Sequence, residues 1–285
     1  MPSLPVTHYF EWKLCSDATR QYIMHEFAAH GARHIALTDQ WLREILHKTS
    51  AAKTLRRMAD KAGLAFCDAH GLYGPGEDLI TPEAAERPLM LSRHLASFHI
   101  LEDFGISSCA LHISADPDTF PGVTLDGLMD LAARGLETLL PAAEKAGVTL
   151  CLENGWDMNT TPERLIGLLE RFRSPRLGVC YDSGHANIVS RGCGPAPRDA
   201  CVLEKLLPHI VNCHLHDNDG EKDAHELPGA GVIDWPRVME QLARAPRLAA
   251  IQDEVAPFTS AEARSNVPVA ALCRTFDRLL AGLWD

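Results

Sequence analysis

The chain has no apolar run that approaches the roughly 20 residues needed to cross a membrane. Its first residues, Met1–Pro5, lack the basic and apolar regions of a signal peptide. The nine cysteines contain no CxxC pair. Five of them lie in apolar, strand-like segments: Cys67, Cys109, Cys151, Cys180 and Cys213. We therefore expect reduced thiols in a cytoplasmic protein, without disulfides or a Cys–zinc cluster.

Phosphate-binding motifs are also missing, since no GxGxxG or Walker sequence follows a predicted strand. The net charge of −11 argues against a nucleic-acid partner, which would need clustered Lys and Arg. The 285 residues contain no linker or low-complexity segment, and 46% hydrophobic with 23% charged residues is typical of a globular protein. We expect one domain over residues 1–285 that does not enter a membrane, and the sequence leaves homo-oligomers open.

Eight apolar segments alternate with helical patterns along the chain. The predicted strands are residues 8–12, 34–38, 64–70, 108–114, 148–154, 178–182, 210–217 and 249–255. Strand–helix units in series predict a parallel sheet, either open or closed. At least six strands end in His, Glu or Asp, whereas an open sheet gathers its ligand residues at one switch point. Because only closure brings six strand ends around one centre, the sequence predicts a single-domain α/β fold, a (β/α)8 TIM barrel.

Histidine and acidic residues gather at or just beyond the predicted strand ends: His70, His112, Glu153, Asp182, His185, His214, Asp223, His225 and Glu254. Four of them come from four strands and combine three carboxylates with one imidazole: Glu153, Asp182, His214 and Glu254. Such a donor set suits a divalent cation such as Mn, Co, Mg or Zn. Without a cation, the clustered carboxylates would repel one another. Each residue alone is more simply a solvated or hydrogen-bonded side chain, so the prediction of a metal centre depends on the whole set.

Four motifs resemble the xylose isomerase-like TIM barrel superfamily, which includes sugar isomerases and epimerases and the endonuclease IV type of apurinic endonuclease. The motifs are Leu152–Asn154, Gly178–His185, His214–Trp235 and Gln252–Glu254. In the isomerase and epimerase members, the matching side chains bind one catalytic metal. The resemblance implies this role for Glu153, Asp182, His214 and Glu254. It also implies that His185, three residues after Asp182, touches the substrate.

His214 and His216 compete for the same ligand position, since residues two apart on a strand face the same way. The resemblance favours His214, because an acid and then an asparagine, Asp217 and Asn218, follow it at the matching spacing. Under this choice, His216 lines the same pocket or pairs with Asp217. We also expect His70 and His112 to contact the substrate.

The resemblance implies a metal-dependent isomerase or epimerase that acts on a sugar or sugar derivative. A metal that bridges a carbonyl and a neighbouring hydroxyl acidifies the C–H bond between them and stabilises the resulting enediolate. Glu153 and Glu254, from the fifth and eighth strands, then remove and return the proton. Trp12 and Trp156 lie just beyond strand ends, where they either cover apolar faces of the sugar or simply pack. The expected partner is a small sugar or keto-polyol.

Three alternatives stay open. An endonuclease IV-like phosphodiesterase acting on abasic DNA would use the whole set as ligands of three zinc ions, with His185, Asp223 and His225 as additional ligands. An inosose-type dehydratase of the same superfamily is compatible with the segment Asp217–Lys222, where ketose 3-epimerases of the family tend to carry an arginine. The third alternative is a barrel that binds a sugar without turnover, although the retained pair of glutamates argues against it.

Overall fold

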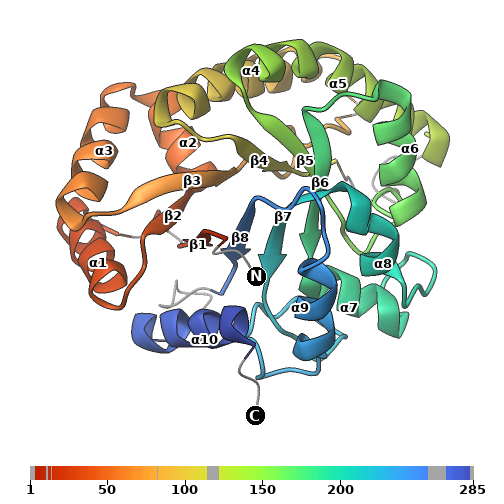
Figure 1. The fold of residues 1–285 in the computed structure, drawn as a ribbon. Coiled ribbons are helices and arrows are strands. Elements are labelled where there is room, and N and C mark those ends of the chain that lie inside the picture. Colours follow the sequence, from red (N-terminus) through yellow and green to blue (C-terminus); the bar gives the residue numbers. More distant parts are fainter. Residues whose placement is uncertain are drawn as a thin grey trace.

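The computed structural model describes residues 4–10, 12–13, 15–81, 83–113, 122–255 and 268–282. Within these residues, eight parallel strands form a closed barrel in sequence order, and β8 closes on β1 (Figure 1). The strands are β1 (Val6–His8), β2 (His34–Leu37), β3 (Ala65–His70), β4 (Ser108–Leu111), β5 (Thr149–Glu153), β6 (Leu177–Asp182), β7 (Ile210–Leu215) and β8 (Ala250–Asp253). This closed ring confirms the TIM-barrel fold that the strand ends predict.

The helices surround the barrel (Figure 1) and connect successive strands. They are α1 (Asp17–Ala29), α2 (Asp39–His47), α3 (Ser50–Ala62), α4 (Arg87–Phe104), α5 (Leu125–Ala146), α6 (Pro162–Phe172), α7 (Ser183–Arg191), α8 (Val202–Leu206), α9 (Trp235–Leu242) and α10 (Val269–Ala281), with a short 3-10 helix η2 (Leu207–His209). None of the described helices is long and apolar enough to span a bilayer.

The first strand lies earlier in the chain than the predicted 8–12, because Val6–His8 are the residues that pair with β2 and β8. Phe10 and Trp12 leave the sheet and pack together, with ring centroids 4.4 Å apart. The Trp12 ring also lies 5.6 Å from that of Trp41 on α2. The apolar pattern of 8–12 therefore reflects packing outside the sheet. Two residues of the predicted strands, Glu11 and Ser114, lie outside the described residues.

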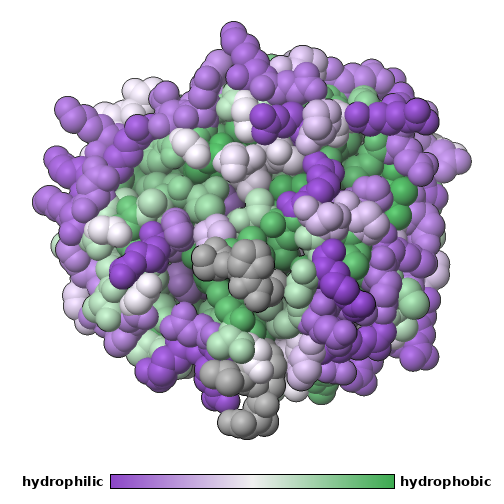
Figure 2. Space-filling view, viewed as in Figure 1, coloured by the Kyte–Doolittle hydropathy of each residue, from purple (hydrophilic) through white to green (hydrophobic). Residues whose placement is uncertain are grey.

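A cluster of small apolar side chains lies inside the barrel, and larger ones form the main core between strands and helices. The inner cluster consists of Ala110, Cys151, Cys180 and Val211. All nine cysteines are free. In the view of Figure 2, polar side chains cover the outer ring of helices and apolar side chains gather towards the centre of the face. Polar side chains are buried within the strands as well: Asn212 on β7 donates to the carboxylate of Asp68 on β3 (3.0 Å).

Asp217, two residues beyond β7, ties down the long connection between β7 and α9. Its carboxylate accepts hydrogen bonds from Gly229 N (2.8 Å), Ile233 N (3.2 Å) and the indole nitrogen of Trp235 (2.8 Å). An antiparallel bridge between Asp217 and Glu226 adds two backbone hydrogen bonds. The residues between 217 and 226 are therefore held as a loop against the barrel instead of extending into solvent.

We predict that Asp217→Asn lowers the free energy of unfolding by about 2–3 kcal/mol, because an amide NH2 faces N–H donors that lose their acceptor in a buried site. Urea unfolding followed by circular dichroism measures this loss. Asp219→Asn is the matched control, since Asp219 is exposed and bonds only within its own turn; it should change the midpoint much less. Equal midpoints for both variants would contradict the role given to Asp217.

Candidate metal centre and active site

The strand ends bring the predicted rim residues to one end of the barrel. Glu153 closes β5, Asp182 closes β6 and His70 closes β3. His214 is the penultimate residue of β7, and Glu254 directly follows β8. Because parallel strands of a closed barrel end on the same face, residues far apart in the chain become neighbours. They form two adjoining groups.

The first group, the glutamate group, consists of His70, His112, Glu153, His214 and Glu254. Nδ1 of His214 lies 3.1 Å from Glu254 Oε1 and 3.3 Å from Glu153 Oε2. Nε2 of His112 lies 3.4 Å from the same Glu153 oxygen, and Nε2 of His70 lies 3.9 Å from each glutamate. All except His112 are buried. Two carboxylates and three imidazoles thus meet in a largely buried space, with His112 at its exposed side.

Charge balance in this group fits a bound cation. Burial raises the pKa of Glu153, but His214 and His112 outweigh it and hold this pKa well below its usual range. Burial lowers the pKa of His214, but Glu254 and Glu153 outweigh it and raise this pKa to about 10. Glu153 therefore stays ionised and requires positive charge beside it.

The donor atoms of the glutamate group also fit a metal ion. Neither ring nitrogen of His214 has a hydrogen bond among the described residues, although Nδ1 approaches two carboxylates. Buried polar atoms without partners are rare in folded proteins unless a ligand or ion satisfies them. Imidazole nitrogen together with carboxylate oxygen is a donor set that Zn, Mn and Co accept.

The second group, the aspartate group, consists of Asp182, His185, His216, Asp223 and His225. Nε2 of His216 lies 3.1 Å from Asp182 Oδ2, and Nε2 of His225 lies 2.9 Å from Asp223 Oδ2. Nε2 of His185 lies 3.8 Å from Asp223. The rings of His216 and His225 stack in parallel, 4.0 Å apart. This group also has donors for a divalent ion.

The two groups touch through His185 and His225. Nδ1 of His185 lies 3.4 Å from Glu153 and 3.6 Å from Asp182. His225 Nδ1 donates to the backbone oxygen of Glu254 (2.7 Å). The four ligands predicted for one metal therefore divide: Glu153, His214 and Glu254 lie in the glutamate group, and Asp182 lies in the aspartate group. The reason is that Asp182 Oδ2 bonds to His216 while its Oδ1 caps α7 at His185 N.

Sequence reasoning left His214 and His216 as competitors, and the structure separates them. His214 lies between the two glutamates, and its role as a metal ligand stays a prediction. His216 does not pair with Asp217, because Ser183 holds its backbone: Ser183 Oγ donates to His216 O (2.8 Å) and accepts from His216 N (3.0 Å). A side chain at Gly184 would overlap the His216 ring. The Asp-Ser-Gly-His sequence at the start of α7 therefore makes room for His216 beside Asp182.

The two tryptophans have different surroundings. Trp156 is 36% exposed, and its ring lies 4.6 Å from that of His185. An indole in this position can cover the apolar face of a bound sugar. Trp12 is 0% exposed. It therefore has no open ring face to place on a sugar, and packing is its role in the barrel.

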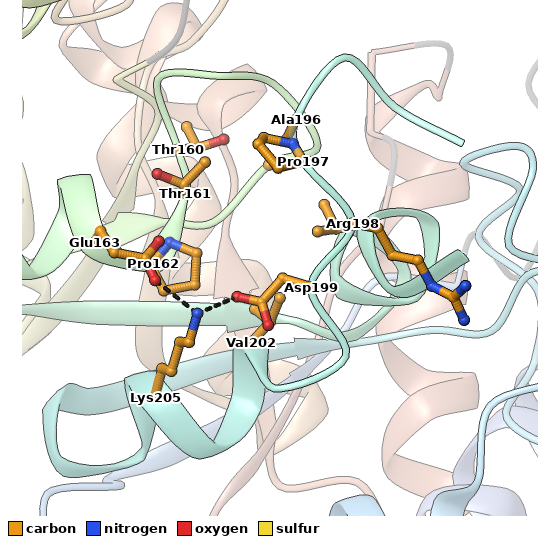
Figure 3. Close-up of a pocket in the computed structure, with 12 residues that line it drawn as sticks. Thr160, Thr161, Pro162, Glu163, Ala196, Pro197, Arg198, Asp199, Val202 and Lys205 are labelled. Carbon is orange, nitrogen blue, oxygen red and sulfur yellow. Dashed lines mark hydrogen bonds and ion pairs between the residues drawn. The ribbon is translucent and has the colours of Figure 1, made fainter. Parts of the chain in front are cut away.

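Trp156 lies on the β5–α6 loop, which a neighbouring salt bridge stabilises. Lys205 on α8 bridges Glu163 (2.6 Å) and Asp199 (2.7 Å) across a small pocket (Figure 3). On the same side, Ala196 N donates to the backbone oxygen of Trp156 (3.2 Å). No residue of the glutamate or aspartate group lines this pocket. We assign it a structural role in fixing the Trp156 loop.

Two residues near the glutamate group, Tyr73 and Asp78, do not lie at a strand end, so the strand-end pattern of the sequence does not identify them. The Tyr73 ring lies 4.9 Å from the rings of both His70 and His112. Burial raises the pKa of Asp78, in the same β3–α4 loop, to about 6, with His112 opposing the shift. Both closely follow His70, the last residue of β3, in the chain. This proximity is the one feature of the sequence that could have identified them.

Comparison with known proteins gives the family. The family model described as xylose isomerase-like TIM barrel matches residues 24–247. The uncharacterised protein y4fM of Sinorhizobium fredii is 30% identical over 215 residues, which cover 66% of this chain and 65% of that protein. A probable endonuclease 4 of Mycoplasmopsis pulmonis is 24% identical over 110 residues, 36% of this chain and 40% of that protein. The chain thus matches less than two thirds of the length of these relatives.

Solved structures share the fold at low sequence identity. The 3-keto-D-glucoside 4-epimerase YcjR from E. coli has a TM-score of 0.76 and 14% identity, covering 98% of this chain and 100% of its own. A D-tagatose 3-epimerase-like protein has a TM-score of 0.76 and 18% identity, covering 97% and 98%. The IOLI protein with a bound zinc atom has a TM-score of 0.74 and 13% identity, covering 98% and 99%. From its closed barrel, its clustered strand ends and the match over residues 24–247, this chain belongs to the xylose isomerase-like TIM barrel family.

Proposed function

We propose that this protein is a divalent-metal-dependent isomerase or epimerase acting on a sugar or sugar derivative. The observation that carries the proposal is the approach of two buried glutamates, from β5 and β8, to one nitrogen of His214. Sugar epimerases among the structures with this fold support it. Structures named for bound zinc and magnesium support the use of a metal.

The metal is proposed to bind Glu153, His214 and Glu254, with Asp182 as the fourth ligand after a change of its side-chain partner. Once bound, a divalent cation supplies a Lewis acid that polarises a substrate carbonyl and makes the adjacent C–H more acidic. Glu153 and Glu254 enter the site from strands on different sides of the barrel, so one carboxylate can remove the proton and the other can return it. His112 and His185, each 3.4 Å from Glu153, orient its carboxylate. Trp156 covers the sugar.

A second function has a specific observation in its favour. The aspartate group, with Asp182, His185, Asp223 and His225, supplies the further ligands that an endonuclease IV-like phosphodiesterase with three zinc ions would need. The net charge of −11 counts against DNA as the substrate. We therefore rank the phosphodiesterase second.

Glu153→Gln and Glu254→Gln should each lower solvent exchange of the substrate C–H by about 10²–10⁴-fold, because an amide cannot accept the proton. The assay incubates metal-loaded protein with ketoses, inososes and hydroxy-keto acids in deuterated water and follows deuterium by mass spectrometry. Glu170→Gln, on the exposed surface of α6, is the control and should exchange like the wild type. Full exchange by both active-site variants would rule out their acid–base role.

Metal binding should release protons. Before metal binds, His214, with a pKa of about 10, holds a proton near neutral pH. Only neutral imidazole binds a metal, so lowering the pH favours the protonated, metal-free form. Apparent affinity for Mn²⁺ should fall about tenfold per pH unit for each proton released, between about pH 8 and pH 6. Titration calorimetry in buffers of different ionisation enthalpy counts these protons, and an affinity independent of pH would contradict the assignment.

Asp223→Asn separates the two functions by metal content. It removes a carboxylate of the aspartate group and none of the glutamate group. With a single catalytic metal in the glutamate group, the variant and the wild type should both hold one divalent ion per chain, as measured by inductively coupled plasma mass spectrometry. Loss of a second or third zinc from the variant alone, together with nicking of an abasic oligonucleotide by the wild type, would favour the phosphodiesterase. Asp219→Asn in the same loop is the control.

A further inference from the structure

One cysteine of the inner cluster lies beside the glutamate group. The sheet register pairs Cys180 on β6 with Glu153 on β5. The sulfur of Cys180, a carboxylate oxygen of Glu153 and a ring nitrogen of His214 all lie within 4.8 Å of one another. From its apolar strand alone, Cys180 is expected to be a core thiol. In the folded barrel, this thiol meets two of the proposed metal ligands.

The Cys180 thiol differs in its partners from the other fully buried cysteines of the strands. The thiols of Cys109 and Cys151 each donate to a backbone oxygen at 3.6 Å, and that of Cys213 does so at 3.9 Å. In the part of the chain that the structure describes, the Cys180 thiol makes no such hydrogen bond. Its sulfur is therefore available to another partner.

The two neighbours of Cys180 also have donor atoms without partners. Among the described residues, no hydrogen bond reaches Glu153 Oε2 or either ring nitrogen of His214, and all three atoms are buried. A metal ion needs no open pocket to meet such atoms, because it binds in the space between its ligands. Tetrahedral zinc with bonds of about 2.0–2.1 Å holds its nitrogen and oxygen donors about 3.3 Å apart. Nδ1 of His214 lies 3.3 Å from Glu153 Oε2, so the spacing of these donors fits an ion between them.

Strand β6 directs two donors towards the site, and one of them is already engaged. Cys180 and Asp182 are two residues apart on the strand, so their side chains face the same way. Asp182 Oδ2 lies 3.1 Å from Nε2 of His216, and Oδ1 accepts from His185 N at 2.7 Å. Cys180 can therefore supply a ligand from β6 without the change of partner that Asp182 requires.

We propose that Cys180 binds the metal of the glutamate group as a thiolate, together with Glu153 and His214, and that the site selects Zn²⁺ over Mg²⁺ and Mn²⁺. This inference rests on the metal centre of the function proposed above and narrows the choice of metal. When the sulfur–metal bond forms, the S–H bond breaks and its proton passes to water, with no change of oxidation state. Thiolate together with imidazole suits zinc, whereas Mg²⁺ and Mn²⁺ prefer oxygen donors.

X-ray absorption spectroscopy of the zinc-loaded wild-type protein tests the sulfur ligand directly. We expect a zinc–sulfur distance of about 2.3 Å beside zinc–nitrogen and zinc–oxygen distances of about 2.0–2.1 Å. Spectra at one and at two zinc ions per chain cover the case in which the aspartate group fills first. Only nitrogen and oxygen neighbours at both loadings would overturn the proposal, and so would a sulfur neighbour that persists in Cys180→Ser.

Cys180→Ser also tests the choice of metal, with Cys151→Ser of the same inner cluster as the matched control. The readout is the ratio of the affinities for Zn²⁺ and Mn²⁺, measured by competition with a chromophoric chelator. Partial misfolding lowers both affinities and cancels in this ratio. The ratio should fall about tenfold in Cys180→Ser, because a hard hydroxyl replaces the soft sulfur, and should match the wild type in Cys151→Ser.

An unchanged ratio in Cys180→Ser, or an equal fall in both variants, overturns the proposal. Failure of the proposed function has a different signature: the zinc–sulfur distance is present, yet no sugar exchanges deuterium. Conversely, deuterium exchange by a protein whose metal has only nitrogen and oxygen neighbours would keep the isomerase and remove Cys180 from its ligands. Absence of bound metal under all conditions would overturn both.

Discussion

The compensation of two buried carboxylates by positive charge is the constraint on which this site depends. Glu153 and Glu254 are taken out of water at the ends of β5 and β8, and both face Nδ1 of His214. Buried carboxylates are stable in the ionised state only beside a cation or a protonated imidazole. Binding a metal and binding a proton are therefore competing solutions to the same electrostatic problem.

The barrel could be predicted from the sequence because its polar residues fall at strand ends, and only a closed sheet brings so many ends together. His214 could also be favoured, because the Asp217-Asn218 spacing after it resembles a known motif. Both inferences use the two-residue period of a strand and the order of residues along the chain. These are properties that a sequence displays directly.

The division of the predicted ligands into two groups could not be foreseen, because it depends on side-chain partners instead of strand position. Asp182 turns to His216, and His216 fits there because Gly184 has no side chain. Trp12 follows a strand like Trp156, yet the path of the chain after β1 buries it.

The hydrogen bonds of Asp217 bear on the order in which the two groups lose their structure when the protein partly unfolds. Glu153 and His214 belong to strands of the barrel, whereas Asp223 and His225 lie on the β7–α9 loop, which the Asp217 carboxylate and the Asp217–Glu226 bridge hold. Surface loops open with a smaller free energy than core strands. Partial melting of this loop would move Asp223 and His225 away first and leave the glutamate group assembled, so the two parts of the centre differ in durability.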